Sequence, residues 1–293
     1  MNSISLKLPF SSITALFYGS VLIAPFCQAA TVSDPSTLWT TFQGTYDFLS
    51  DQQTGVTAGD IVGSGTNRGF FVTFNNNGPS SNTDGTLGFR IRLDSAGGNT
   101  NNPAFDRVAF IGIDGDIDGD IDAFLGLNLQ GNSAEIGIHS AGTGSNTSPS
   151  TTTITSTPAT RYSLTAANYN YRPVNFLTDG GTTSDVTTTT TGDPDYYVSF
   201  MVPFADVVAF LNTKSISIND QSPLRYVVAT STQTNSLNQD LGGVNSGINS
   251  STTWVALGGF SQIVTASGTV IPEPSSLLLL FTSVVGFCAI RRR

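Results

Sequence analysis

Residues 114–122 combine five aspartates with two glycines and two isoleucines, in the order Asp-Gly-Asp-Ile-Asp-Gly-Asp-Ile-Asp. Carboxylates this close together repel one another unless a cation lies among them. A hard cation such as Ca²⁺ takes roughly 6–8 oxygen ligands, many of which this segment can supply. The spacing therefore predicts a calcium site, and the alternative is a solvated acidic turn without an ion. The predicted ligands are Asp114, Asp116, Asp118, Asp120 and Asp122.

The spacing of this run resembles the first part of an EF-hand calcium loop. With Asp114 at the first position, Gly119 falls where the sharp turn needs a glycine, Asp120 gives its backbone carbonyl and Ile121 points inward. The resemblance ends at Leu125, which stands where the EF-hand has a bidentate glutamate. The flanking segments also have the pattern of strands. We therefore expect an EF-like loop between two β-strands, with the missing ligand supplied by a distant side chain or by water.

The rest of the chain predicts an all-β fold. Residues 87–94 alternate apolar and polar side chains, which is typical of a half-buried strand. Many short strands separated by turn-rich loops indicate one antiparallel β-sandwich or jelly-roll-like domain over residues 30–270. The loops 140–160 and 178–195 are rich in Thr, Ser and Gly and are expected at the surface. Further strands are expected at 69–74, 107–113, 123–129, 134–139, 196–202, 215–218, 224–230 and 254–257, and a short helix at 204–211.

Charge and composition exclude several classes of function. Residues 30–270 contain eight basic and twenty acidic residues, a net charge of −12, which disfavours nucleic acids and anionic lipids as partners. Cys27 and Cys288 lie near the two ends of the chain, so disulfides and cysteine-ligated metals are excluded between them. The chain has one histidine, His139, which excludes a multi-histidine metal site.

Three single residues invite a functional interpretation beside a structural one. His139 precedes Ser140 and could belong to a catalytic triad, but we expect it to be exposed on the polar face of its strand. Arg90 and Arg92 share one face of their strand and could contact acidic neighbours or an anionic sugar. Surface solubility is the role we expect for both arginines.

Two further groups of polar residues are open to two interpretations each. The run 230–240 carries three oxygen-bearing side chains that could complete a calcium shell or a ligand rim, or simply form a surface loop: Asn235, Asn238 and Asp240. Tyr162, Tyr169 and Tyr171 could stack on sugar rings, but core packing is expected of them.

Both ends of the chain have the features of processing signals. Residues 1–29 contain a weakly basic start, a short apolar stretch and small residues before Ala29, so we expect a helical signal peptide that is removed after export. At the other end, residues 271–293 combine Pro-Glu-Pro, a short apolar stretch and three terminal arginines. The sorting residues are Pro272, Glu273, Pro274, Arg291, Arg292 and Arg293.

The C-terminal set resembles the PEP-CTERM sorting signal of Gram-negative exopolysaccharide producers. The resemblance implies recognition by a membrane-embedded exosortase that removes the tail after export across the inner membrane. The apolar stretch 277–290 is a predicted helix of roughly 21 Å, shorter than a ~30 Å hydrocarbon core. This length favours transient membrane insertion over a permanent anchor.

These observations predict an exported protein at the cell surface or in the extracellular biofilm matrix. We expect a calcium-stabilised, structural, adhesive or glycan-binding role without enzymatic activity. The expected partners are exosortase and the secretion machinery, with exopolysaccharide as a further candidate. The alternative is a secreted polysaccharide-active hydrolase, which would need a pair of carboxylates in a cleft away from residues 114–122.

Overall fold

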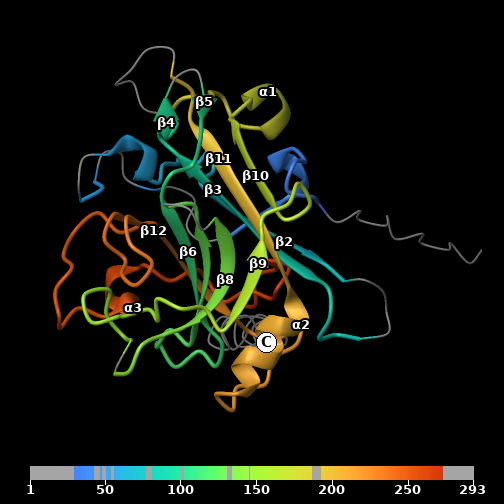
Figure 1. Cartoon of the computed structure of the whole chain (residues 1–293), viewed down its shortest axis with the longest axis vertical. Coiled ribbons are helices and arrows are strands. Elements are labelled where there is room, and N and C mark those ends of the chain that lie inside the picture. The colour runs from blue at the N-terminus through green and yellow to red at the C-terminus, as the bar shows by residue number, and fades with distance from the viewer. Residues whose placement is uncertain are drawn as a thin grey trace, which may run out of the picture.

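Two antiparallel sheets form the body of the protein (Figure 1). The computed structural model describes residues 30–42, 47, 51–53, 56–76, 81–99, 102–130, 134–144, 146–186 and 193–272. The five-stranded sheet has the order β1 (Thr40–Thr41), β2 (Phe70–Asn75), β3 (Thr86–Leu93), β11 (Tyr196–Pro203) and β10 (Tyr169–Pro173). The six-stranded sheet has the order β13 (Asp240–Leu241), β12 (Arg225–Ser231), β6 (Val108–Asp114), β7 (Ala123–Asn128), β8 (Glu135–Ser140) and β9 (Thr160–Ser163).

The remaining elements are short and lie around the two sheets. They are the strand pair β4 (Gly98–Asn99) and β5 (Asn102–Pro103), the 3₁₀ turns η1 (Ser36–Leu38) and η2 (Thr57–Gly59), and the helices α1 (Phe176–Asp179), α2 (Phe204–Asn212) and α3 (Trp254–Leu257). Helices α1 and α2 lie at opposite ends of the molecule in Figure 1. The predicted antiparallel sandwich and the predicted helix at 204–211 are confirmed.

The apolar side chains of the two sheets meet in one core. In β3 this face consists of Leu87, Phe89, Ile91 and Leu93, all buried, as the alternation predicts. Phe89 contacts Tyr226 of β12 edge-on, with ring centroids 5.1 Å apart. Burial of aromatic and branched side chains on both inner faces stabilises the sandwich, because about 25 cal/mol is gained per Å² of apolar surface removed from water.

The outer face of the five-stranded sheet is also covered, so the prediction of a half-buried β3 is wrong. Arg90 and Arg92 are fully buried, not at the surface. The Arg90 guanidinium donates to Ser199 Oγ (2.8 Å), Ser36 Oγ (2.9 Å) and the Val32 carbonyl (2.9 Å). The segment that precedes β1 therefore lies over this face and satisfies an arginine that the strand alone would leave in water.

The outer face of the six-stranded sheet is covered by the loop after β8 and by α3. His139 is only 3 % exposed, which corrects the prediction of an exposed histidine. Its Nδ1 lies 2.7 Å from the Thr155 carbonyl, and its ring contacts Phe110 edge-on. Burial lowers the pKa of His139, so the ring is neutral at pH 7. It is a packed core residue, and among the residues that the structure describes its ring has no hydrogen bond to a serine or an aspartate.

Three other local predictions are wrong. Residues 215–218 contain no strand, and residues 254–257 form α3 instead of a strand. The Thr253 side chain accepts a hydrogen bond from Ala256 N (3.1 Å) and caps α3. The Ser- and Thr-rich loop 140–160 is not confined to the surface, because Thr152 and Ile154 are buried under α3 and beside the sheet. Short apolar runs do not distinguish strand from helix by periodicity alone.

The predicted terminal helices, 1–29 and 277–290, lie outside the described residues. Within the described part of the chain, no helix has the length and apolar character needed to cross a membrane.

Candidate metal centres

The loop between β6 and β7, residues 114–122, is folded around its first carboxylate; we call it the Asp loop. Asp114 is fully buried, and its two oxygens accept hydrogen bonds from Ile117 N (2.7 Å) and Gly119 N (3.2 Å). At the other end, Asp122 accepts from Gly115 N (2.8 Å). Gly119 has φ +95°, a conformation that favours glycine, as the EF-like register predicts.

Three of the five predicted ligands converge. Asp114, Asp116 and Asp122 each offer a carboxylate oxygen within 4.8 Å of the others. The structure does not bring Asp118 and Asp120 into this group: the Asp118 carboxylate instead accepts a hydrogen bond from Asp120 N (2.9 Å). Ile121 is 1 % exposed and points inward, as predicted.

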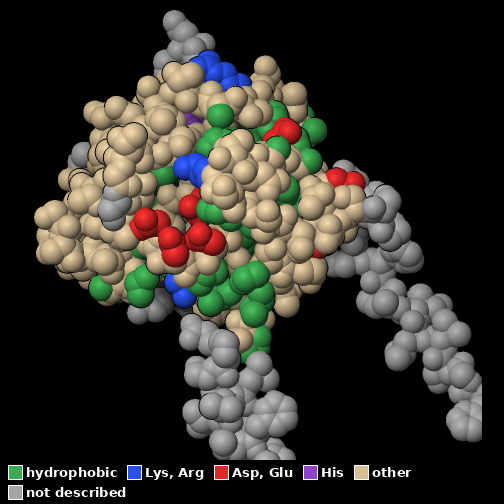
Figure 2. Space-filling model, turned by 90° about the horizontal axis from the view of Figure 1, so that it is seen from below, with side chains coloured by type: hydrophobic (Ala, Val, Ile, Leu, Met, Phe, Trp, Pro, Cys, Tyr) green, Lys and Arg blue, Asp and Glu red, His purple; other side chains and the backbone are tan. Residues whose placement is uncertain are grey.

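The Asp loop packs against α2 on one side and is open to solvent on the other. A Cβ on Gly115 would lie 3.1 Å from Ile216 and 3.3 Å from Leu211, so the loop lies against the end of α2. Asp116 and Asp118 are exposed, and Figure 2 shows acidic side chains gathered on the face seen from below. Within the described residues, no histidine, cysteine, aspartate or glutamate from outside the loop joins the converging carboxylates. The further ligands of a bound cation would therefore come from backbone carbonyls or water.

Burial sets the protonation of the Asp loop. Together with the smaller effect of the neighbouring carboxylates, it raises the pKa of Asp114 and of Asp122 to about 6, although the backbone N–H groups that donate to them act in the opposite direction. Burial and the charges of Asp118 and Asp116 also raise the pKa of Asp120. A divalent cation would remove this cost, because it stabilises the ionised form of each carboxylate that it contacts.

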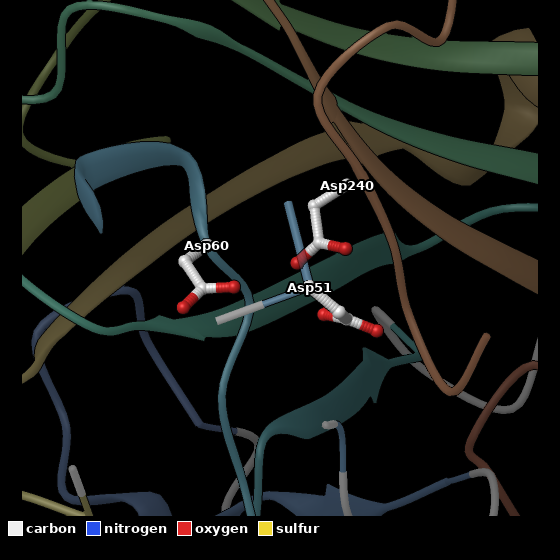
Figure 3. Close-up of side chains that lie close together, drawn as sticks. All are labelled: Asp51, Asp60 and Asp240. Carbon is white, nitrogen blue, oxygen red and sulfur yellow. The ribbon is translucent and has the colours of Figure 1, made fainter. Parts of the chain in front are cut away.

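The structure assembles a second group of carboxylates, Asp51, Asp60 and Asp240, which we call the acid triad (Figure 3). Asp60 follows η2 and Asp240 begins β13, and both are buried. Asp240 accepts hydrogen bonds from Ile61 N (2.6 Å) and Leu241 N (2.8 Å). In Figure 3 the carboxylates of Asp240 and Asp51 lie next to each other. Each of the three offers an oxygen within 4.8 Å of the others.

The acid triad is more strongly perturbed than the Asp loop. Neither oxygen of Asp51 is accessible to solvent or accepts a hydrogen bond from another described residue. Burial raises the pKa of Asp51 to about 6. Burial, together with the charges of Asp51 and Asp60, raises the pKa of Asp240 to about 8. At neutral pH this group therefore holds a proton unless a cation replaces it.

Sequence reasoning missed Asp51 and Asp60. It named Asp240 as a candidate for completing the calcium shell, but the structure places Asp240 in the acid triad, apart from the Asp loop. No local signal could have found the triad, because its members come from distant segments. The hydrogen bond from Ile61 N, next to Asp60, to Asp240 spans 179 positions of the chain. Of the two other candidates in the run, Asn238 accepts a hydrogen bond from Thr232 N (2.9 Å) within its own loop, and Asn235 is exposed.

A third carboxylate group contains its own cation. Asp94, Asp185 and Asp195 converge in the same way, but Arg92 Nε contacts Asp195 at 2.5 Å, with both side chains fully buried. Burial raises the pKa of Asp195 to about 7, while Arg92 acts in the opposite direction. The alternative interpretation, in which Arg92 pairs with an acidic neighbour, therefore replaces the surface role that we expected. The fixed guanidinium makes this group a poor site for a metal ion.

The structure describes the first of the six sorting residues. Pro272 is exposed, and Glu273, Pro274, Arg291, Arg292 and Arg293 lie outside the described residues.

The C-terminal segment matches a known family model. Residues 270–293 match the family model of the PEP-CTERM protein-sorting motif. No curated protein and no solved structure matches the chain. The chain thus carries a PEP-CTERM sorting motif, as its C-terminal residues predict, and this motif indicates an exported protein that is sorted through exosortase.

Proposed function

We propose that this chain is a calcium-stabilised β-sandwich with a structural or adhesive role at the cell surface or in the extracellular matrix. The sorting motif supports delivery outside the cell. The observation that carries the calcium proposal is the convergence of Asp114, Asp116 and Asp122 in a loop whose carboxylates have raised pKa values. Calcium relieves the repulsion among these carboxylates and joins the ends of β6 and β7.

The calcium proposal is tested by thermal unfolding of the protein recovered outside the cells. An ion that binds only the folded state stabilises it by about 2.7 kcal/mol at one hundred times its Kd. We therefore expect a higher unfolding temperature in millimolar Ca²⁺ than in chelator, with a smaller effect of Mg²⁺, which prefers stricter octahedral geometry. Equal unfolding temperatures in calcium and in chelator would contradict the proposal.

The export part of the proposal includes removal of the apolar tail after the Pro-Glu-Pro residues. A helix over residues 277–290 is short for permanent anchoring. We expect the extracted protein to lack residues 277–293 when its intact mass is measured. A main species that still ends in Arg293 would show that the tail is retained. A glycan array on the same sample distinguishes a glycan-binding role from a purely structural one.

One observation favours an enzymatic alternative. A pocket of about 260 Å³, away from the Asp loop, is lined by Asp51 and Asp240. The raised pKa of Asp240 would keep a proton available for general acid catalysis, as a glycoside hydrolase requires. Two features oppose this role: Asp240 is only 3 % exposed, and both of its oxygens accept backbone hydrogen bonds. Release of reducing ends from polysaccharides, lost in Asp240→Asn, would favour the hydrolase.

A further inference from the structure

Another pocket lies on the outer face of the five-stranded sheet, and we call it the Trp39 pocket. It has a volume of about 200 Å³, and its aromatic lining consists of Trp39, Phe71 and Tyr197. Phe71 contacts Tyr197 edge-on, with ring centroids 5.7 Å apart. The segment with η1 and the end of α1 border the pocket, and they lie side by side in Figure 1.

Contacts between distant segments hold the Trp39 pocket in shape. Ser36 N donates to the Asp179 carboxylate (2.8 Å), which joins η1 to α1 across 143 positions of the chain. Elsewhere in the pocket wall, Asn67 Oδ1 accepts a hydrogen bond from Thr182 N (2.8 Å). Gly181 has φ +99°, and a Cβ there would lie 2.6 Å from Asn67 Oδ1. The segments that form the walls are therefore held in place before any ligand arrives, which lowers the entropic cost of binding.

Positive charge concentrates around this pocket although the protein is acidic. Of the eight basic residues between positions 30 and 270, Arg68 lines the pocket, and Arg90 lies 4.3 Å from the Trp39 ring centroid. Neither arginine has a carboxylate within 4.0 Å among the described residues. Burial, followed by the charge of Arg172, lowers the pKa of Arg90 to about 10, so Arg90 stays charged at neutral pH.

Two hydrogen-bond donors of the lining side chains have no partner. Trp39 Nε1 and Arg68 Nη1 are inaccessible to solvent, and neither donates a hydrogen bond within the described part of the chain. Trp39 is 6 % exposed. A buried donor without an acceptor costs about 1–3 kcal/mol. Rotation of the two side chains toward an anion in the pocket, with more than one acceptor oxygen, would remove this cost for both donors.

The one acidic residue in the lining does not oppose an anion. Asp179 contacts Arg172 at 2.5 Å and 2.7 Å through its two oxygens. Burial alone would raise the pKa of Asp179, but the hydrogen bonds from Arg172, Ser36 and Asn175 outweigh it and lower the pKa to about 2. The negative charge of Asp179 is therefore already balanced by the arginine beside it.

We propose that the Trp39 pocket binds a carboxylate, with Arg68 and Trp39 Nε1 as donors and with Phe71 and Tyr197 against the carbon skeleton of the ligand. The pocket is smaller than the roughly 300–1,000 Å³ of pockets for drug-sized ligands, so it admits only a small group. Two sources fit this chemistry: a free small acid, or the carboxylate of a sugar acid within a polymer. The site is separate from the Asp loop and does not depend on calcium.

The test is calorimetric titration of the protein recovered outside the cells, in buffer free of carboxylates and with chelator. The probes are galacturonate, an oligogalacturonide and neutral galactose. We expect galacturonate to bind and galactose not to bind. Tighter binding of the oligomer than of the monomer identifies a polymer as the source, and equal binding identifies a free acid. Binding of galactose as strong as that of galacturonate, or no binding of either acidic probe, would overturn the proposal.

Three variants locate the binding. Arg68→Met is expected to weaken galacturonate binding at least tenfold, because it removes a charged donor, and Trp39→Phe severalfold, because it removes Nε1 and keeps an aromatic ring. Arg161→Met is the matched control, since Arg161 is an exposed arginine of β9 in the other sheet, is paired with Glu135 and does not line the pocket. Trp39→Phe keeps the test decisive if Arg68→Met does not fold. Unchanged affinity in the folded variants would place the ligand elsewhere and overturn the assignment.

Discussion

The Asp loop and the acid triad each bring three carboxylates within 4.8 Å of one another, but the chain gathers them in opposite ways. The Asp loop takes its carboxylates from nine consecutive residues, leaves Asp116 exposed and holds Asp114 with two backbone N–H groups. The acid triad takes them from separate segments and removes Asp60 and Asp240 from water. The pKa reaches about 6 in the loop and about 8 in the triad. The comparison teaches that burial, more than the number of carboxylates, decides whether a proton balances the charge at neutral pH.

The largest expected effect comes from the third group, where Arg92 is the balancing cation. We expect Arg92→Met to lower the free energy of unfolding by about 3 kcal/mol, because Asp195 loses its buried partner. The loss should grow as the pH rises above 7, since a raised carboxyl pKa in the folded state makes ionisation more costly there. Urea unfolding at two pH values measures it. Arg107→Met, which removes a partly exposed pair with Asp106, is the control, and an equal loss in both variants would contradict this prediction.

The second prediction concerns the proton on the acid triad. A carboxyl group whose pKa is raised by folding binds more protons in the folded than in the unfolded state, so stability falls as the pH rises through the interval between the two values. For Asp240 this interval runs from the ordinary 3.8 to about 8. In chelator, we expect a loss of on the order of 2–3 kcal/mol between pH 6 and 8.

Two variants separate the triad from the other carboxyl groups. Asp240→Asn should reduce the loss between pH 6 and 8, whereas Asp193→Asn, outside all three carboxylate groups, should leave it unchanged. The Asp loop contributes mainly below pH 6, because its pKa values are lower. A pH profile of Asp240→Asn that matches the original protein would mean that the triad does not hold the proton.

The third prediction places calcium in the Asp loop. Asp114→Ala should abolish the stabilisation by calcium and, in chelator, lower the free energy of unfolding by about 2 kcal/mol, because Ile117 N and Gly119 N lose their acceptor. Asp240→Asn should keep the calcium effect. Thermal unfolding of both variants, with calcium and with chelator, measures these differences. The opposite result, with calcium stabilisation lost only in Asp240→Asn, would reverse the roles of the two regions.

The smallest expected effect is that of Asp120→Ala. Asp120 lies outside the converging carboxylates, and the EF-like register assigns it only a backbone carbonyl ligand. We expect the calcium affinity to change by less than about threefold, equivalent to about 0.6 kcal/mol. Asp118→Ala should weaken binding more, because it also removes the acceptor of Asp120 N. Calorimetric titration of calcium into both variants tests this order, and a larger loss in Asp120→Ala would contradict it.

The strands were predictable where the apolar pattern is long. The sequence predicts β3, β6 and β11 to within one or two residues, β3 from its alternation and β6 and β11 from apolar runs of seven residues. Residues 254–257 were not, because four residues around Trp254 fit either structure and the Thr253 cap decided for a helix. The Asp loop was predictable for a similar reason, since its carboxylates and its glycine turn are neighbours in sequence.

The β-rich character, the acidic loop between two strands and the sorting motif could be predicted from the sequence, because each depends on residues close together in the chain. What the alternating polar residues face depends on how the whole chain packs. Arg90, Arg92 and His139 have the spacing of solvent-exposed side chains, yet other segments cover both outer faces and supply their partners. The acid triad and the Trp39 pocket also depend on contacts between distant segments. Their parts meet only when distant segments pack together, and the resulting loss of water changes their charge and their hydrogen bonding.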